Sequence, residues 1–300
     1  MEPLPRPQLS VVVPVYNEAG NVAPLFTEIR DVLTSLGRPF EVIYVNDGSH
    51  DATLSQLRAL QEGYPELCVV DLDGNFGEAA ALCAGFATAR AALVITLDGD
   101  GQNDPHDIPR LLATLEHGGY RVVSGWRKTR QEDVWSRVIP SRLANTMIRW
   151  VTGIPAHDNG CGLKIYRREI VHGAALPRGL NRFLPAILGV TAAEVAEVAV
   201  HDRNRQHGVS HYGLSRTGAV LRDVLAIPFL VRQPETNQRR FALTAVLALL
   251  WMLVGRSGCL PALIFLLSAS IWWNLRRFNR GRRDGVYRIG AVYPSNLGSA

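Results

Sequence analysis

The chain has only four cysteines, and none is spaced as the cysteines of metal or redox sites are (Cys68, Cys83, Cys161 and Cys259). Their separation excludes zinc-finger and thioredoxin-like motifs and indicates a reducing compartment. No G-x-G-x-x-G follows the first predicted strand, which argues against a dinucleotide-dependent dehydrogenase. The opening stretch MEPLPRPQLS has no hydrophobic segment. We therefore expect no signal peptide to carry residues 1–240 outward.

Lysine is absent from the last hundred residues, where arginine supplies all the positive charge. Residues 201–300 hold 14 Arg against 4 acidic residues, a net charge of +10, whereas residues 1–200 carry a net charge of −5. Such a basic segment could bind nucleic acid or an anionic membrane surface. The neighbouring residues are strongly apolar, so we predict a membrane and no nucleic acid.

Two apolar runs, Phe241–Gly255 and Cys259–Trp273, are separated only by Arg256, Ser257 and Gly258. One helix of this total length would measure about 50 Å, longer than a single ordinary span. The glycines and serine between the runs favour a turn, so we predict a transmembrane hairpin of two short helices. A single kinked span and a re-entrant hairpin remain alternatives. Arginines flank both ends, which indicates a cytoplasmic catalytic domain.

Strand and helix patterns alternate through the first part of the chain. The predicted strands are Leu9–Tyr16, Phe40–Asp47, Leu67–Asp73 and a run from Ala89 to Leu97. This alternation predicts an α/β fold with a mostly parallel sheet that is covered on both faces. Two later stretches, 133–153 and 216–233, have helical spacing with interspersed arginines. The first fits a core helix or a helix on a lipid surface equally well, and the second favours the lipid surface.

The stretch LDGDGQNDP places Asp98, Asp100 and Asp104 directly after a buried strand. A calcium loop of the EF-hand type is excluded, because Asn103 and Pro109 occupy the positions that need Gly and Glu. A solvated turn is the simplest alternative. Open α/β sheets bind ligands at the carboxyl ends of their strands, which favours a divalent cation site here. Asp104 precedes a proline and is expected to cap a helix.

Several motifs occur together in a specific order: VVVPVYNE, VNDGSHDAT, NFG, LDGDGQNDP, SGWR and DNGCGLKIYRREI. In this order they resemble family 2 glycosyltransferases, and most of all the polyprenyl-phosphate glycosyltransferases, which include the dolichyl-phosphate mannose synthases and their bacterial relatives. The resemblance covers about residues 9–232. It implies a GT-A type fold and inverting transfer of a hexose from a nucleotide sugar to polyprenyl phosphate. It also implies a Mg²⁺ or Mn²⁺ cofactor.

The resemblance assigns roles to residues one by one. Asp100 and Gln102 match metal ligands, and Asp98 matches a nucleotide-sugar contact that could also touch the metal. Gly99 stands where relatives commonly have Ala, a change expected only to loosen the turn. Arg127 matches an arginine that faces the donor phosphates. The other positions that match contacts around the nucleotide are Pro14, Tyr16, Glu18, Val45 and Asp47.

A second group of positions matches the acceptor and sugar sites. Arg137 and Ser141 match residues that hold the acceptor phosphate, as does Arg205. His211 stands where relatives have lysine, so its charge at neutral pH is not assured. Asp158 aligns with a loop that lines the sugar site.

These assignments divide the chain into four segments. We expect a GT-A catalytic domain at 1–200, an acceptor-site segment with a juxtamembrane helix at 201–240, a transmembrane hairpin at 241–273 and a basic cytoplasmic tail at 274–300. The expected partners are a nucleotide sugar, polyprenyl phosphate and the bilayer, and a homo-oligomer is left open. GDP-mannose and UDP-glucose are both candidate donors, and uronic and amino sugars are not excluded. The alternatives are another lipid or glycan acceptor, or an inactive nucleotide-sugar-binding membrane scaffold.

Overall fold

The computed structural model describes most of the chain: residues 6–128, 146, 148–150, 152–204, 223, 226–230, 233–254 and 259–295. Four residues that the sequence assigned to the acceptor phosphate lie outside the described residues: Arg137, Ser141, Arg205 and His211. Most of the two arginine-containing stretches expected at 133–153 and 216–233 also lies outside them.

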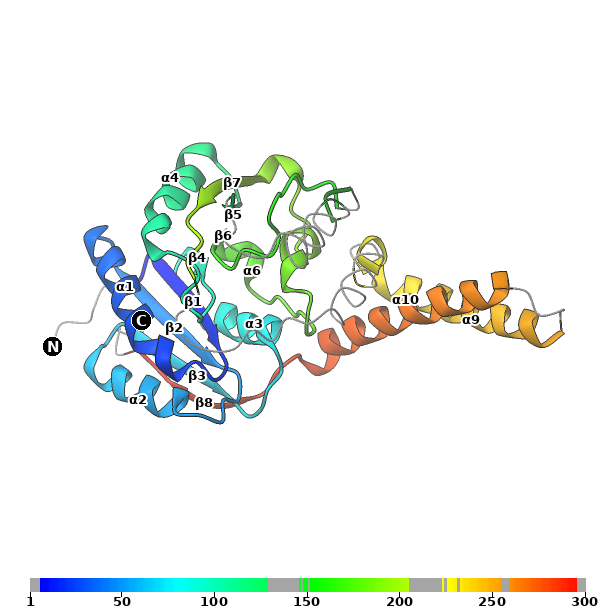
Figure 1. Cartoon of the computed structure of the whole chain (residues 1–300), viewed down its shortest axis with the longest axis horizontal. Helices are drawn as coiled ribbons and strands as arrows, with labels where there is room; N and C mark the ends of the chain where they lie inside the picture. Colours follow the sequence, from blue (N-terminus) through cyan, green and yellow to red (C-terminus); the bar gives the residue numbers. More distant parts are fainter. Residues whose placement is uncertain are drawn as a thin grey trace.

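Four parallel strands form the centre of the sheet, in the order β3-β2-β1-β4 (Figure 1). They are β1 (Leu9–Val15), β2 (Phe40–Asn46), β3 (Leu67–Leu72) and β4 (Leu93–Thr96). All four correspond to strands predicted from the sequence. They are almost wholly buried and rich in Val and Ile, as expected for parallel strands that are covered on both faces.

Alternate side chains of these strands enter two separate cores. Val12 and Ile43 face the first core, together with α3 (Glu78–Thr88). Val11 and Val13 face the second. The helices that cover this second face are α1 (Ala19–Ser35), α2 (Thr53–Gly63) and α4 (Ile108–Gly118). The strand ends are therefore held from both sides, which fixes the loops that follow them.

Four further strands extend the sheet at its two edges, giving the order β7-β5-β6-β4-β1-β2-β3-β8. These strands are β5 (Val122–Arg127), β6 (Lys164–Arg167), β7 (Val195–Val200) and β8 (Ile289–Tyr293). Six of the eight strands run in one direction, whereas β6 and β8 are antiparallel to their neighbours. The expectation of a mostly parallel sheet is confirmed, with two reversed strands that were not predicted. A short helix, α6 (Arg168–Val171), follows β6 directly.

Two long helices pack side by side and project away from the α/β domain (Figure 1). Helix α9 covers Pro234–Val254 and helix α10 covers Cys259–Asp284. The interruption between the two helices falls where the sequence predicted a turn, but both helices are longer than expected. Their 21 and 26 residues correspond to roughly 32 and 39 Å at about 1.5 Å per residue. Among the described residues, α10 alone has the length and hydropathy of a membrane span.

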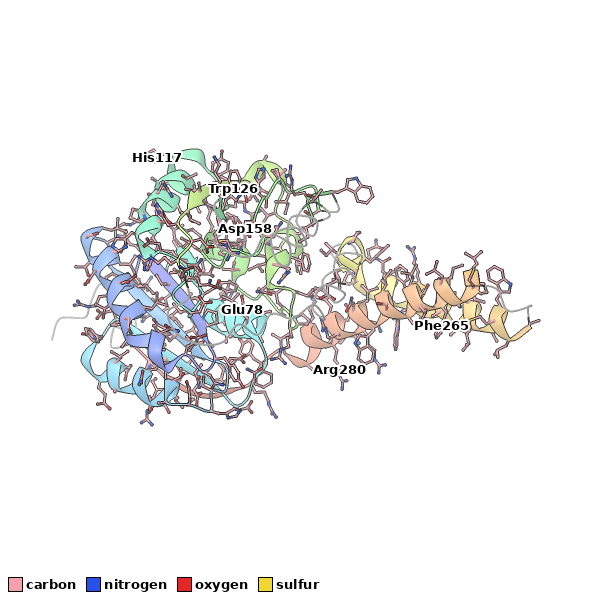
Figure 2. The ribbon with its side chains drawn as sticks, viewed as in Figure 1. Glu78, His117, Trp126, Asp158, Phe265 and Arg280 are labelled. Atoms are coloured by element: carbon pink, nitrogen blue, oxygen red, sulfur yellow. The ribbon has the colours of Figure 1, made fainter. Side chains whose placement is uncertain are left out.

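The two halves of helix α10 differ in how far their apolar side chains are exposed. Leu260, Leu263 and Leu266 in its first half are each more than half exposed, whereas Leu275 and Phe278 are buried in the first core of the α/β domain. Figure 2 shows Phe265 on the projecting part of the pair and Arg280 near the domain. The second half of α10 is thus part of the catalytic domain as well as part of the helix pair.

The segment 274–300, expected as a separate basic tail, contains the last eleven residues of α10 and strand β8. Strand β8 pairs with β3, and the Arg288 guanidinium lies 3.0 Å from the Asp73 carboxylate. The described part of the segment expected as a basic cytoplasmic tail is therefore attached to the sheet through β8. The sequence pattern missed β8 because an edge strand of five residues, mostly exposed, has too little hydrophobic periodicity to be recognised.

The burial of Phe278 makes α10 a structural element of the catalytic domain. We expect Phe278→Ala to lower the free energy of unfolding by about 3–5 kcal/mol, because it leaves a cavity in the core. Leu266→Ala, on the exposed half of the same helix, should change it by no more than about 0.5 kcal/mol in detergent. Denaturation of the full chain in detergent measures both values, and equal effects would contradict this account of α10.

Candidate active site

The predicted cation loop follows β4 and lies at the carboxyl end of the parallel strands. Asp100 is 8% exposed, and its Oδ1 accepts a hydrogen bond of 3.1 Å from the Gln102 amide. Asn103 Oδ1 accepts one of 3.1 Å from the Asp98 amide. These bonds close the loop on itself, because backbone amides and side-chain oxygens satisfy one another locally. The three residues predicted to surround a cation are thereby brought into one turn.

Close packing against the end of β1 favours glycine at position 99, which the sequence alone did not reveal. A Cβ at this position would lie 2.5 Å from Val15 Cγ1 and 2.8 Å from the Pro14 carbonyl oxygen. The loop therefore approaches the end of β1 more closely than an alanine would allow. The expectation that glycine only loosens the turn is wrong, because it also permits this contact.

Negative charge is concentrated around Asp98. Burial, reinforced by the charges of Glu78 and Asp100, raises the pKa of Asp98 to about 8, although Arg127 and Lys164 oppose the shift. Glu78, at the exposed start of α3, adds a further negative charge, and its Oε1 accepts a hydrogen bond of 2.5 Å from Asn181. The repulsion among these carboxylates is the kind that a divalent cation relieves.

The sequence did not identify two charged residues of this site, Glu78 and Lys164. Figure 2 shows Glu78 on α3, which follows the NFG motif. Lys164 begins β6 and is 6% exposed; its Nζ donates to the carbonyl oxygens of Asn159 and Cys161. Lys164 belongs to a recognised motif and Glu78 directly follows one, but only the folded chain shows that their charges lie near Asp98.

Arg127 and Asp158 form a buried ion pair. Nε of Arg127 lies 2.8 Å from Asp158 Oδ2 and Nη2 lies 3.3 Å from Oδ1. Burial alone would lower the pKa of Arg127, but the charge and hydrogen bonds of Asp158 raise it above its ordinary value. The sequence assigned these residues to the donor phosphates and the sugar site separately. The structure brings them into direct contact, so that Asp158 orients the guanidinium.

The loop that carries Asp158 is fixed from two directions. Glu197 Oε1, on β7, accepts hydrogen bonds of 2.7 Å from the His157 amide and 3.2 Å from the Asp158 amide. A Cβ on Gly162 would lie 2.2 Å from Asp98 Cγ, so the same loop rests directly on the cation-site carboxylate. Glycine at this position allows the two loops to meet.

Asp47 organises a second cluster at the end of β2. Its carboxylate accepts hydrogen bonds of 2.7 Å from the Phe76 amide, 2.8 Å from the Gly77 amide and 3.1 Å from Asn75 Nδ2. Burial raises the pKa of Asp47, and the two backbone amides oppose that shift. The NFG motif is thereby tied to the VND motif. Asn46, the last residue of β2, donates a hydrogen bond of 2.7 Å to Asp71.

The remaining predicted nucleotide contacts lie at neighbouring strand ends. Tyr16 is 38% exposed, and the Glu18 amide donates a hydrogen bond of 2.9 Å to Thr53. Pro14 pairs in register with Val45 in the parallel ladder. Val45 is fully buried in the first core, so its side chain is directed away from the surface. Strands β1 and β3 also flank Val45 on both sides, so its contact with the nucleotide stays a prediction.

Arg203 links the cation loop to two other segments. Its amide donates a hydrogen bond of 3.0 Å to the Gln102 carbonyl oxygen, and its guanidinium lies 2.7 Å from Asp104 and 2.6 Å from Glu28. Asp104 also caps the next helical turn by accepting from the His106 amide, which confirms the predicted cap. The sequence gave no signal for Arg203, because its partners are about a hundred or more residues away along the chain.

The oxygen ligands of the loop fit a hard divalent cation such as Mg²⁺ or Mn²⁺. Within the described residues, no three His, Cys, Asp or Glu side chains are arranged to hold a metal. Mg²⁺ usually takes only one or two carboxylates, with substrate phosphates and water as its other ligands. Asp100, Gln102 and the adjoining Asp98 match that donor set.

Comparison with known proteins identifies the family. The sequence profile of "Glycosyl transferase family 2" matches residues 10–173. The chain belongs to glycosyltransferase family 2. This enzyme is 43% identical over 235 residues to a dodecaprenyl-phosphate galacturonate synthase of Rhizobium johnstonii, covering 77% of the chain and 69% of that relative. The resemblance read from the motifs is thus confirmed at the level of the family.

A second relative is an undecaprenyl-phosphate 4-deoxy-4-formamido-L-arabinose transferase of Pseudomonas paraeruginosa. It is 41% identical over 218 residues, which cover 72% of this glycosyltransferase and 63% of the relative. Among solved structures, glucosyl-3-phosphoglycerate synthase of Mycobacterium tuberculosis, in complex with Mn²⁺, UDP-glucose and glycerol 3-phosphate, has a TM-score of 0.56 at 22% identity. That match covers 74% of this chain and 79% of the other. The expected GT-A type fold is confirmed.

The raised pKa of Asp98 predicts how the metal-free glycosyltransferase responds to pH. Asp98 holds its proton more tightly in the folded state, so its contribution to stability is present at low pH and is lost as pH rises toward about 8. In EDTA, the melting temperature should fall between about pH 5 and about pH 8, and Asp98→Asn should flatten the decline. Identical slopes in the two proteins would refute this assignment.

The Arg127–Asp158 pair predicts a stability effect that differs from that of an exposed pair. Asp158→Asn removes the nearer of two buried counter-charges of the Arg127 guanidinium, which is 13% exposed and keeps only Asp202 at 3.9 Å, so the change should cost about 3–5 kcal/mol. Glu66→Gln, which breaks the pair with the 41% exposed Arg30, should cost about 1 kcal/mol or less. Urea denaturation compares the two variants, and a similar small loss in both would contradict a buried pair.

Proposed function

We propose that this glycosyltransferase transfers a sugar from a nucleotide sugar to polyprenyl phosphate at the cytoplasmic face of a membrane, with inversion at the anomeric carbon. The proposal rests on two features that occur in the same domain. The carboxylate loop at Asp98–Gln102 lies at the carboxyl ends of the parallel strands. The core of the domain contains the second half of helix α10, whose first half is apolar and exposed.

The residues of the site suit departure of a nucleoside diphosphate. Asp100 and Gln102 would hold the divalent cation, with Asp98 beside them, and the bound cation supplies Lewis-acid stabilisation of the leaving diphosphate. Arg127 is oriented by Asp158 to place a second positive charge at the site. Pre-oriented charge of this kind stabilises a developing anion without reorganisation.

The acceptor needs no general base in this mechanism. A phosphate monoester is already anionic at neutral pH, so the enzyme has only to position it and partly neutralise its charge. The Asp158 carboxylate is engaged by Arg127 and by the Gly160 amide, which fits a role in orientation rather than proton transfer. Direct displacement then gives the inverted product without a covalent intermediate on the enzyme.

The helix pair supports the membrane location. Helix α9 begins, and α10 ends, at the α/β domain, so both ends of the pair lie on the same side of any bilayer that the pair enters (Figure 1). The apolar side chains exposed on α9 include Leu243, Val246 and Leu250. Arg239 and Arg240 precede them, and Arg276 and Arg277 follow the exposed part of α10. The positive-inside rule then puts the catalytic domain in the cytoplasm.

The relatives guide the choice of donor. One is named for galacturonate and another for 4-deoxy-4-formamido-L-arabinose, and the structural neighbour contains UDP-glucose. These names support testing nucleotide-linked uronic and modified amino sugars alongside GDP-mannose and UDP-glucose. Lipid-linked sugar formed from one donor of such a panel would establish both the donor and the acceptor class.

The decisive experiment offers membranes that contain the enzyme a panel of radiolabelled nucleotide sugars with polyprenyl phosphate, with and without EDTA. We expect Asp100→Asn to reduce transfer by at least about a hundredfold, because removing a preorganised electrostatic contribution has effects of that order. Asp31→Asn, on an exposed position of α1, is the matched control and should retain activity. EDTA should abolish transfer by the wild type.

Full activity of Asp100→Asn would refute the cation assignment. Transfer to another lipid or glycan, with none to polyprenyl phosphate, would favour a different acceptor. Nucleotide binding without any turnover would favour a scaffold.

A further inference from the structure

The loop Pro177–Asn181 lies between helix α10 and the nucleotide motif. On the α10 side, Arg277 Nη2 donates a hydrogen bond of 3.0 Å to the Arg178 carbonyl oxygen. A Cβ on Gly281 would lie 3.3 Å from Pro177 Cγ, so the helix and the loop are in close contact. Leu176 and Leu180, which border this contact, belong to the same core as Leu275 and Phe278.

On its other side, the loop contacts the NFG motif through the Arg178 side chain. The Arg178 guanidinium donates a hydrogen bond to Asn75 Oδ1. Its stem lies over Gly77, where a Cβ would approach Arg178 Nε to 2.6 Å and Cγ to 2.7 Å. Gly77 also has a φ of +93°, a backbone conformation that residues other than glycine rarely adopt. The arginine and this turn are therefore fitted to one another.

The same turn holds Asp47. Asn75 Nδ2 lies 3.1 Å from Asp47 Oδ2, and the Gly77 amide donates to that oxygen at 2.8 Å. A continuous set of contacts thus runs from Arg277 on α10, through Arg178, to Asn75 and Gly77, and ends at Asp47. The positive charge of Arg178 also favours the ionised form of Asp47.

We propose that Arg178 is a positioning residue that braces the Asn75–Gly77 turn and Asp47 for nucleotide binding, and that Arg277 of α10 holds Arg178 in place. This inference rests on the proposed function, in which Asp47 contacts the nucleotide. It gives the second half of α10 a role beyond attachment. Helix α10 supports donor affinity because it contacts the loop Pro177–Asn181, which in turn holds the nucleotide motif in place.

The test uses the full chain in detergent, with UDP and GDP as probes in the presence of Mn²⁺. Isothermal titration should show that Arg178→Ala weakens binding of the preferred nucleotide about tenfold, the effect of losing a charge-assisted hydrogen bond. Arg178→Lys keeps the charge and should restore part of the affinity. Arg277→Ala should weaken binding by a smaller factor, and should add nothing in the Arg178→Ala background because both act through one route. Arg280→Ala, 75% exposed on α10, is the matched control and should bind as the wild type does.

Hydrogen exchange tests the brace independently of any ligand. The Phe76 and Gly77 amides, which donate to Asp47, should exchange faster in Arg178→Ala and Arg277→Ala than in the wild type, and unchanged in Arg280→Ala. If the wild type binds neither nucleotide but exchange responds as expected, the proposed function fails and the brace stands. If the wild type binds and the Arg178 variants match it in affinity and exchange, the brace is overturned. Should Arg178→Ala not fold, Arg178→Lys and Arg277→Ala decide the question by the same two measurements.

Discussion

Several carboxylates lie close together at the carboxyl ends of the parallel strands, and the catalytic domain is arranged around their mutual repulsion. Glu78 and Asp100 lie near enough to Asp98 to raise the pKa of its carboxyl. Charges in this position are tolerable only when cations are fixed nearby, because burial penalises an isolated carboxylate. Lys164, Arg127 and a divalent cation would serve this purpose together. Strand β6 supplies Lys164 and strand β5 supplies Arg127, so two strands added beside the four central ones supply the positive charge near Asp98.

The attachment of the helix pair to the α/β domain is the second main feature of the architecture. In helix α10 the first half is apolar and exposed, and the second half is packed into the domain core. The helix is continuous over 26 residues. Under the proposed function, this continuity holds the active site in one orientation to the membrane, so that a lipid-embedded phosphate meets the donor in one geometry.

Contiguous features of the chain could be predicted from the sequence. The four central strands and the cation loop appear as continuous runs, and the ordered motifs indicated the family and hence the GT-A fold. Side chains that act across long separations could not be predicted. Arg178 contacts Asn75 and Arg203 contacts Glu28 across 103 and 175 residues. A single arginine in a loop has no local pattern that distinguishes a distant protein partner from solvent.

Residues in recognised motifs were partly misjudged for the same reason. Gly99 and Gly162 were part of the recognised motifs. Gly99 lies close to the end of β1 and Gly162 lies close to Asp98, and these two contacts become apparent only in the folded chain. Strand β8 was missed because it is short and mostly exposed, and because it follows two apolar helices, after which a basic tail was the simpler expectation. Its pairing with β3 depends on α10 returning to the domain.

The place of β8 in the chain has a consequence for biogenesis. Strand β3 is made early, yet its outer edge acquires its partner only after both apolar helices have left the ribosome. Until then, the unpaired backbone of β3 is an open template of the kind that promotes aggregation. The edge of β3 is therefore closed only after the helix pair has been made, so the last strand of the chain protects an edge that was formed much earlier.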